Sequence, residues 1–214
     1  MRKNDMSCPP FSENEDIFVT RSPLPPLAEY LRCVEDIFAT RRLTNNQTYV
    51  HRLEESLGCF LKLSHVSLCV NGTAALQLAL RLSGLAGKKV LTTPFTYVAT
   101  LSALLWEGCT PVFADIDPDT LCLAPEAVEE ALDVHPDVAG LLPVHVYGNA
   151  CDVDRLERLC IERGLTCMYD AAHAFGSVLN GRSLLAFGDY AACSFHATKL
   201  FHTVEGGCLV THSI

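Results

Sequence analysis

Short apolar segments alternate with helical segments from residue 65 onward, and this alternation restricts the possible folds more than any other feature. The apolar segments are HVSLCV (65–70), KVLTT (89–93), TPVFADI (110–116), VAGLLPVHV (138–146) and LTCMYD (165–170). Residues 72–85, 97–108, 124–132 and 152–164 lie between them with the apolar spacing of helices. Continuous apolar strands that alternate with helices form a mostly parallel sheet flanked by helices on both faces. The sequence therefore predicts an α/β fold, which binds its ligands at the carboxyl ends of the strands.

The first 60 residues follow a different pattern. Residues 1–16 contain no apolar core of a signal peptide, and we expect them to be a disordered tail. Residues 17–60 are predicted to be an N-terminal helical segment, with helices over 23–42 and 46–62. Residues 61–214 then form the α/β domain.

Composition excludes several classes of function. The net charge is -9 and the pI is about 5.3, which argues against nucleic acid and against an anionic membrane surface as partners. No run approaches the roughly 18 apolar residues of a membrane span. The 11 cysteines are odd in number and form no C-x-x-C pair, as expected for reduced thiols in a cytoplasmic protein.

Three polar features each follow the end of a predicted strand. NGTAAL (71–76) leads into a helix through Gly72 and Thr73. The free backbone N–H groups at such a helix start suit a phosphate. An ordinary helix cap has the same sequence pattern. Asp170 ends an apolar strand. A carboxylate that is buried there needs a cation or several hydrogen-bond donors; alternatively, Asp170 simply caps the next turn. Lys199 is a lone amine that follows the apolar segment YAACSF (190–195), which begins like a buried strand, and most such lysines are solvated.

One cofactor needs all three features together. Pyridoxal 5'-phosphate requires a phosphate seat, a carboxylate at its ring nitrogen, an amine that holds it covalently and a flat group against its ring. Asp170 would keep the ring nitrogen protonated, and Lys199 would bind the cofactor and then shuttle a proton. Tyr97 in PFTYVAT would supply the flat group. The sequence therefore predicts a site for this cofactor.

The same residues resemble a known family, the DegT/DnrJ/EryC1/StrS sugar aminotransferases of the aspartate aminotransferase fold (fold type I). Seven segments carry the resemblance in order: LTNN, NGTAAL, PFTYVAT, GCTPVFADIDPDT, PVHVYG, YDAAHAFG and SFHATKLFHTVEGG. The resemblance implies that Lys199 is the Schiff-base lysine and Asp170 the partner of the pyridinium. It also implies cofactor contacts at Gly72, Thr73, Ala74, Tyr97, His173 and Ser194, of which Thr73, Ala74 and Ser194 would bind the phosphate.

The resemblance also implies a substrate. YDAAHAFG and SFHATKLFHTVEGG are most similar to enzymes that transfer the amino group of glutamate to dTDP-4-oxo-6-deoxyglucose. A 3-oxo sugar remains an alternative substrate. His173 stands where many members have glutamine. Members of the family are homodimers, so a homodimer is expected if the chain is complete.

Members of the family are nearly twice as long as this chain, which stops soon after the lysine segment. We therefore expect residues 61–214 to be a partial cofactor-binding large domain, truncated and without the C-terminal small domain. Two alternatives remain open: another enzyme of the same fold, such as a desulfurase or dehydratase, and a non-catalytic remnant or partner subunit that keeps the cofactor pocket.

Other motifs give weaker signals. GLAGKK lacks the Ser or Thr that follows GK in a phosphate-binding loop. His196 and His202 flank Lys199 without a C-x-x-C or H-E-x-x-H companion, so we expect pocket or packing histidines and no metal.

Overall fold

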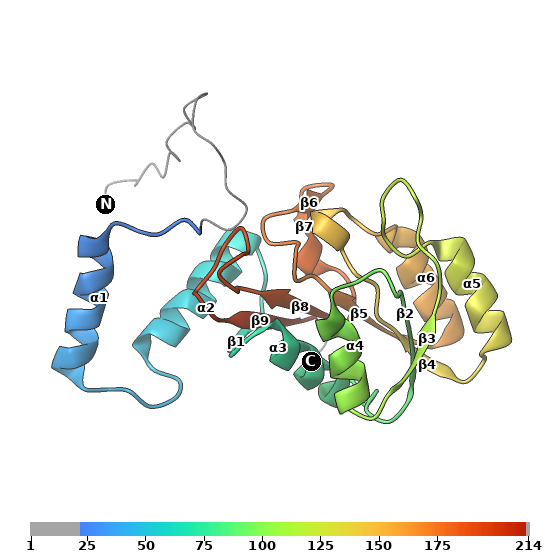
Figure 1. Cartoon of the computed structure of the whole chain (residues 1–214), viewed down its shortest axis with the longest axis horizontal. Coiled ribbons are helices and arrows are strands. Elements are labelled where there is room, and N and C mark those ends of the chain that lie inside the picture. Colours follow the sequence, from blue (N-terminus) through green and yellow to red (C-terminus); the bar gives the residue numbers. More distant parts are fainter. Residues whose placement is uncertain (1–21, 213–214) are drawn as a thin grey trace.

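The computed structural model describes residues 22–212, and its centre is a seven-stranded sheet (Figure 1). The strand order is β1-β9-β8-β5-β4-β2-β3. The strands are β1 (Val66–Cys69), β2 (Lys89–Thr92), β3 (Thr110–Phe113), β4 (Val138–Leu141), β5 (Thr166–Asp170), β8 (Tyr190–Ser194) and β9 (Gly207–Thr211). Only β9 runs against its neighbours β1 and β8, so the predicted mostly parallel sheet is confirmed.

Helices connect the strands and cover both faces of the sheet. They are α1 (Leu27–Thr40), α2 (Thr48–Leu61), α3 (Gly72–Leu82), α4 (Val98–Trp106), α5 (Pro125–Val134), α6 (Val153–Arg163) and the 3₁₀ turns η1 (Val146–Gly148) and η2 (Leu184–Ala186). A small hairpin of β6 (Val178–Leu179) and β7 (Arg182–Ser183) lies outside the main sheet. No helix within residues 22–212 is long and apolar enough to cross a membrane.

The sheet separates two apolar cores. On one face, α3 and α4 pack against every second strand residue, among them Val90, Met168 and Ala192. On the other face, α2, α5 and α6 cover the alternate residues, including Leu91 and Tyr169. Successive side chains of a strand point to opposite faces, so strands that are apolar throughout are what a sheet covered on both faces requires.

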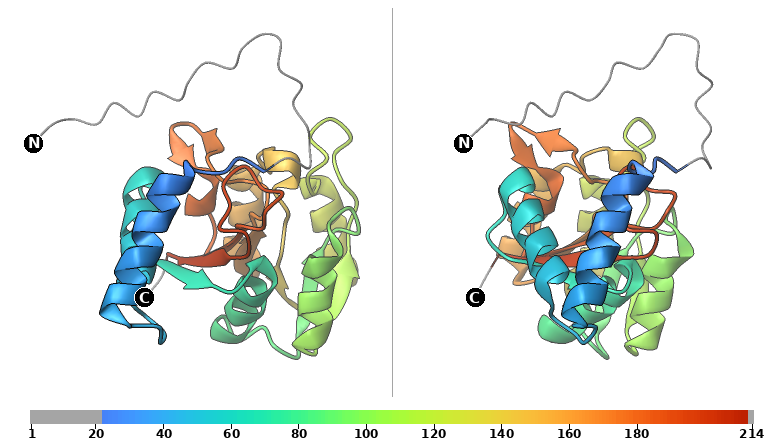
Figure 2. Two further views of the ribbon diagram at one scale, coloured as in Figure 1. Left: turned by 60° about the vertical axis from the view of Figure 1, so that its left-hand side comes forward. Right: turned by 90° about the vertical axis from the view of Figure 1, so that its left-hand side faces the viewer.

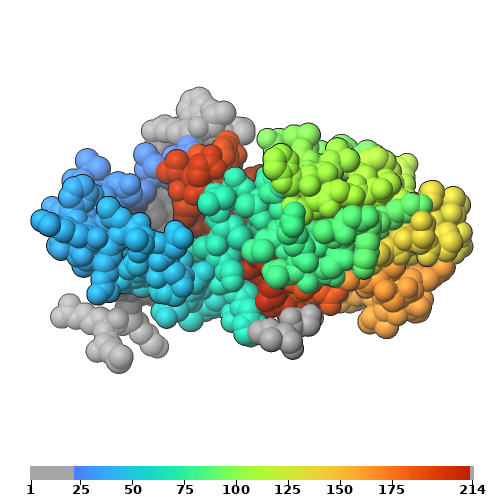
Figure 3. Space-filling view, turned by 90° about the horizontal axis from the view of Figure 1, so that it is seen from below, coloured from blue at the N-terminus to red at the C-terminus, as the bar shows by residue number. Residues whose placement is uncertain are grey.

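The N-terminal helices lie at one end of the molecule, opposite α5 and α6 (Figures 2 and 3). α1 begins after Pro26 and has no buried residue, whereas α2 buries Leu57 and Leu61 beside β1. The two predicted helices are therefore present, although the domain division itself stays a prediction. The tail predicted for residues 1–16 lies outside the described residues.

Candidate active site at the carboxyl ends of the strands

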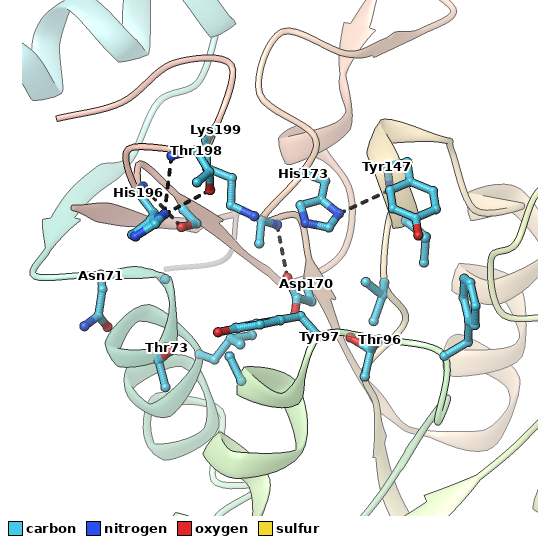
Figure 4. A pocket seen from close by; sticks show the side chains of 18 of the residues that line it. Asn71, Thr73, Thr96, Tyr97, Tyr147, Asp170, His173, His196, Thr198 and Lys199 are labelled. Carbon is cyan, nitrogen blue, oxygen red and sulfur yellow. Dashed lines mark hydrogen bonds between the residues drawn. The ribbon is translucent and has the colours of Figure 1, made fainter. Parts of the chain in front are cut away.

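A pocket of about 650 Å³ lies at the carboxyl ends of the parallel strands (Figure 4). The loops that follow β1, β2, β5 and β8 all reach it, together with η1. Parallel strands end at the same edge of a sheet, so residues far apart in the sequence meet there. Of the eight residues predicted as cofactor contacts, seven line this pocket: Gly72, Thr73, Tyr97, Asp170, His173, Ser194 and Lys199.

Asp170 holds a buried carboxylate at the centre of the pocket. It ends β5, which pairs with β8, and only 4% of its surface is exposed. Oδ2 accepts a hydrogen bond from the Thr100 hydroxyl (2.6 Å), and Oδ1 accepts one from the Ala172 amide (3.0 Å). The Thr96 hydroxyl lies 2.7 Å from that of Thr100 and donates to it, because the proton of Thr100 is already given to Asp170. Residues of two elements, β5 and α4, thus orient the carboxylate.

Lys199 lies in the loop between β8 and β9. An aromatic cluster anchors this loop: the ring of Phe201 stacks on Phe175 (4.7 Å) and meets the buried Phe195 edge-on (5.1 Å). The turn itself is closed by the Lys199 amide, which donates to the His196 carbonyl (2.8 Å). Figure 4 shows Asp170 between the ring of Tyr97 on one side and Lys199 with His173 on the other.

His196 and His202 hold the same loop in shape. Nδ1 of His196 lies 2.9 Å from the Thr198 hydroxyl, and Nε2 of His202 lies 2.7 Å from the Pro23 carbonyl. These bonds give both histidines a structural part in the loop.

Burial lowers the pKa of Lys199 below its usual 10.5, and the nearby Asp170 carboxylate partly opposes that shift. Only the neutral amine attacks a carbonyl carbon. We therefore expect the rate at which the chain attaches pyridoxal phosphate covalently to rise with pH, with a midpoint below 10.5. Stopped-flow absorbance over a pH series measures this midpoint, with Lys199→Ala as the background. A midpoint at or above 10.5 would contradict the burial argument.

The start of α3, which the sequence predicts to bind a phosphate, lines the pocket. Asn71 caps the helix, since its Oδ1 accepts a hydrogen bond from the Ala74 amide (2.8 Å). The amide of Ala74 is therefore already paired, and Ala74 does not line the pocket, in contrast to Gly72 and Thr73. A Cβ on Gly72 would stand 3.0 Å from the Cβ of Ser194, so the helix start lies directly against the end of β8.

Gly207 on β9 permits this close approach. A Cβ there would lie 2.5 Å from the carbonyl carbon of Asn71 and 2.6 Å from the nitrogen of Gly72, both backbone atoms that side-chain rotation cannot move. We expect Gly207→Ala to lower the free energy of unfolding by about 1–3 kcal/mol and to weaken phosphate binding at the helix start. Thermal unfolding and titration with pyridoxal phosphate measure both effects. An unchanged melting temperature would show that the two backbones can separate at no cost.

Tyr97 and His173 occupy opposite sides of the pocket. Tyr97 caps α4, and 71% of its surface is exposed, so its ring is available to a flat ligand. His173 is half-buried, and its pKa is lowered first by burial and then by the positive charge of Lys199, while Asp170 acts in the opposite direction. Its ring lies parallel to that of Tyr147, with centroids 5.9 Å apart.

The chain matches known proteins over nearly its whole length. The model of the DegT/DnrJ/EryC1/StrS aminotransferase family matches residues 27–213. The chain belongs to this family. Among curated relatives, it is 44% identical to the dTDP-4-amino-4,6-dideoxy-D-glucose transaminase of Shigella dysenteriae over 197 residues, which is 92% of this chain and 53% of the relative.

Solved structures of family members share the fold. DesI, crystallised in the presence of its TDP-sugar product, superposes with a TM-score of 0.86 at 36% identity over 92% of this chain and 49% of DesI. A Streptococcus pneumoniae protein described in its PLP form gives a TM-score of 0.80 at 27% identity over 90% of this chain and 52% of that protein. The chain spans about half the length of the relatives it matches.

Five of the seven family motifs quoted from the sequence contribute residues to the pocket, whereas LTNN and GCTPVFADIDPDT do not, and several residues at the site were not predicted. Thr96 and Thr100 orient the carboxylate of Asp170, and Tyr147 contacts His173. Thr100 had a signal in the sequence, because it is a polar residue in a helical segment that is otherwise mostly apolar. Tyr147 had no such signal beyond its place in PVHVYG.

Proposed function

We propose that this chain carries the pyridoxal-phosphate site of an aminotransferase, which moves the amino group of glutamate to a nucleotide-linked oxo-deoxysugar. The observation that supports this most directly is the meeting of Lys199, Asp170 and the start of α3 in one pocket. Because the chain spans about half the length of its relatives, turnover by this chain is part of the proposal.

The residues present fit the cofactor. Free amides at the start of α3, with the hydroxyls of Thr73 and Ser194, suit a phosphate. Within residues 22–212, Asp170 is a buried carboxylate with two hydrogen-bond donors, and it can accept a third hydrogen bond from a protonated ring nitrogen. Tyr97 would lie against the ring of the cofactor.

Pyridoxal phosphate, when bound, supplies a carbonyl group that carries the amino group and a ring that draws electrons from the substrate carbon. Lys199 would hold the cofactor and, once free, carry a proton as a neutral amine, since its pKa is lowered by burial. Asp170 would hold the positive charge at the ring nitrogen, and Thr100 fixes the carboxylate for that task. His173 would donate a hydrogen bond to an oxygen of the cofactor ring.

Relatives support the choice of substrate. The Shigella dysenteriae relative is named as a transaminase of a dTDP-linked 4-amino-4,6-dideoxyglucose, and DesI was crystallised with a TDP-sugar product. We propose dTDP-4-oxo-6-deoxyglucose as the acceptor for this chain. A homodimer, on the family resemblance, and a cytoplasmic location, on the cysteines that are unpaired within residues 22–212, belong to the same proposal.

The test is a coupled assay of the chain loaded with pyridoxal phosphate. With glutamate and dTDP-4-oxo-6-deoxyglucose, we expect equal amounts of 2-oxoglutarate and an amino sugar, whose amine position is read by NMR. Absence of product from this sugar, together with turnover of its 3-oxo isomer, would replace the proposed 4-oxo substrate by a 3-oxo sugar. Cofactor attachment without 2-oxoglutarate would contradict the transaminase and leave a cofactor-binding chain.

A further inference from the structure

We propose that Tyr147 is a positioning residue, which fixes the ring of His173 so that Nε2 presents a hydrogen-bond donor to the pocket. The two residues come from different parts of the chain: Tyr147 from η1 after β4, and His173 from the loop after β5. The inference rests on the proposed function in one respect: the acceptor of the hydrogen bond from Nε2 is taken to be an anionic oxygen on the ring of pyridoxal phosphate. The geometry of the pair stands without it.

The main chain of Tyr147 determines which nitrogen of His173 carries hydrogen. The Tyr147 amide donates to Nδ1 of His173 at 3.3 Å. An amide N–H is always a donor, so Nδ1 must offer its lone pair. A neutral imidazole that accepts at Nδ1 carries its hydrogen on Nε2. His173 is thereby held in one tautomer.

The surroundings favour the neutral ring. Among the described residues, Lys199 and Asp170 are the charged groups that act on His173, and the ring of Tyr147 packs beside it. Burial acts first and lowers the pKa of His173 below its usual 6.5, and the positive charge of Lys199 adds to this, whereas Asp170 opposes it. At neutral pH His173 is therefore a donor without a charge of its own.

The side chain of Tyr147 fixes the plane of that donor. Its ring is parallel to the imidazole within 2°, at a centroid separation of 5.9 Å, which is an offset stack. Yet 71% of Tyr147 is exposed, so core packing does not explain the aromatic residue. The stack with His173 and the wall of the pocket are the contacts that its ring makes there.

The backbone at Tyr147 is strained in a way that serves this contact. Its φ is 54°, in the left-handed region that residues other than glycine rarely adopt, and Gly148 follows at 84°. The turn is held because the His145 amide donates to the carbonyl of Asp170 (3.0 Å) and the Gly148 amide to the carbonyl of His145 (3.1 Å). The turn that positions His173 is thus attached to Asp170 itself.

The test reads the tautomer directly in the cofactor-free chain. Long-range ¹H–¹⁵N correlations of histidine rings show which nitrogen carries hydrogen, and His173→Gln assigns the signal. We expect hydrogen on Nε2 and a pKa below 6.5 in the wild type and in Tyr147→Phe, which keeps the ring. Tyr147→Gly accepts the left-handed backbone without strain, and we expect the pKa of His173 to rise toward about 6.5 as burial is lost.

Two results would overturn the inference: hydrogen on Nδ1 in the wild type, or a pKa of His173 that Tyr147→Gly leaves unchanged. The signal of His212, which lies outside this pocket and contacts the Leu185 carbonyl, reports whether the variant remains folded.

Cofactor binding separates this inference from the proposed function. We expect Tyr147→Gly, but not Tyr147→Phe, to weaken binding of pyridoxal phosphate by about threefold to tenfold, the usual effect of a misplaced hydrogen-bond donor. Equal binding by the wild type and both variants would overturn the positioning role. If the tautomer is as expected and the wild type binds no cofactor, the proposed function fails while the positioning of His173 holds.

Discussion

Lys199→Ala is expected to abolish covalent attachment of pyridoxal phosphate and to lower turnover by on the order of 10³-fold or more. Lys199 is the one lysine that lines the pocket within the described residues, and its pKa is lowered by burial. Alanine removes the amine, so no bond to the aldehyde carbon can form there. The measurement is the visible absorbance of the loaded chain, followed by borohydride reduction and peptide mapping.

Lys88→Ala is the matched control for this experiment. Lys88 is exposed and precedes β2, at the edge of the sheet opposite to the pocket, so its loss should change neither absorbance nor turnover. The reduced cofactor should map to the peptide that contains Lys199. Reduced cofactor on another peptide of the wild type, or an unchanged absorbance spectrum in Lys199→Ala, would contradict the role proposed for Lys199.

The positions of Asp170 and Gly72 were predictable because each lies at a strand end, and Lys199 follows further along the loop after β8. A strand that is apolar on both faces has a well-defined end where the first polar residue appears, and parallel strands bring those ends to one edge. Asp170 closes TCMYD and Gly72 opens α3 in this way. The alternation along the chain therefore fixed the place of the pocket before any distance was known.

Contacts that depend on loop conformation were not predictable by the same means. Ala74 is predicted to contact a phosphate, and in the structure its amide donates to the Asn71 side chain, a pairing that composition does not indicate. Tyr147 contacts His173 only because its backbone is left-handed, a conformation that tyrosine does not favour. Such features arise from packing among several elements, and a local pattern does not contain them.

Asp170→Asn is expected to lower turnover on the order of 10²–10³-fold while changing the affinity for pyridoxal phosphate by less than about tenfold. The two side chains have the same shape, and the Thr100 hydroxyl can turn to accept from the new amide, so the buried site stays paired. What is lost is the negative charge that keeps the ring nitrogen of the cofactor protonated. Rates and binding curves measured on the same loaded protein separate the two effects.

Asp189→Asn is the matched control, and it tests whether the loss of another carboxylate beside β5 also lowers turnover. Asp189 precedes β8, and its Oδ2 accepts from the Cys167 amide (2.9 Å) outside the pocket. Its replacement should cost some stability and leave turnover of the folded fraction unchanged. If both variants lost turnover equally, the loss would come from a disturbed sheet. If Asp170→Asn kept full turnover, the negative charge of Asp170 would have no part in the reaction. A deficit confined to Asp170→Asn is the result that the geometry requires, because the Asp170 carboxylate faces Lys199 and His173 whereas Asp189 lies outside the pocket.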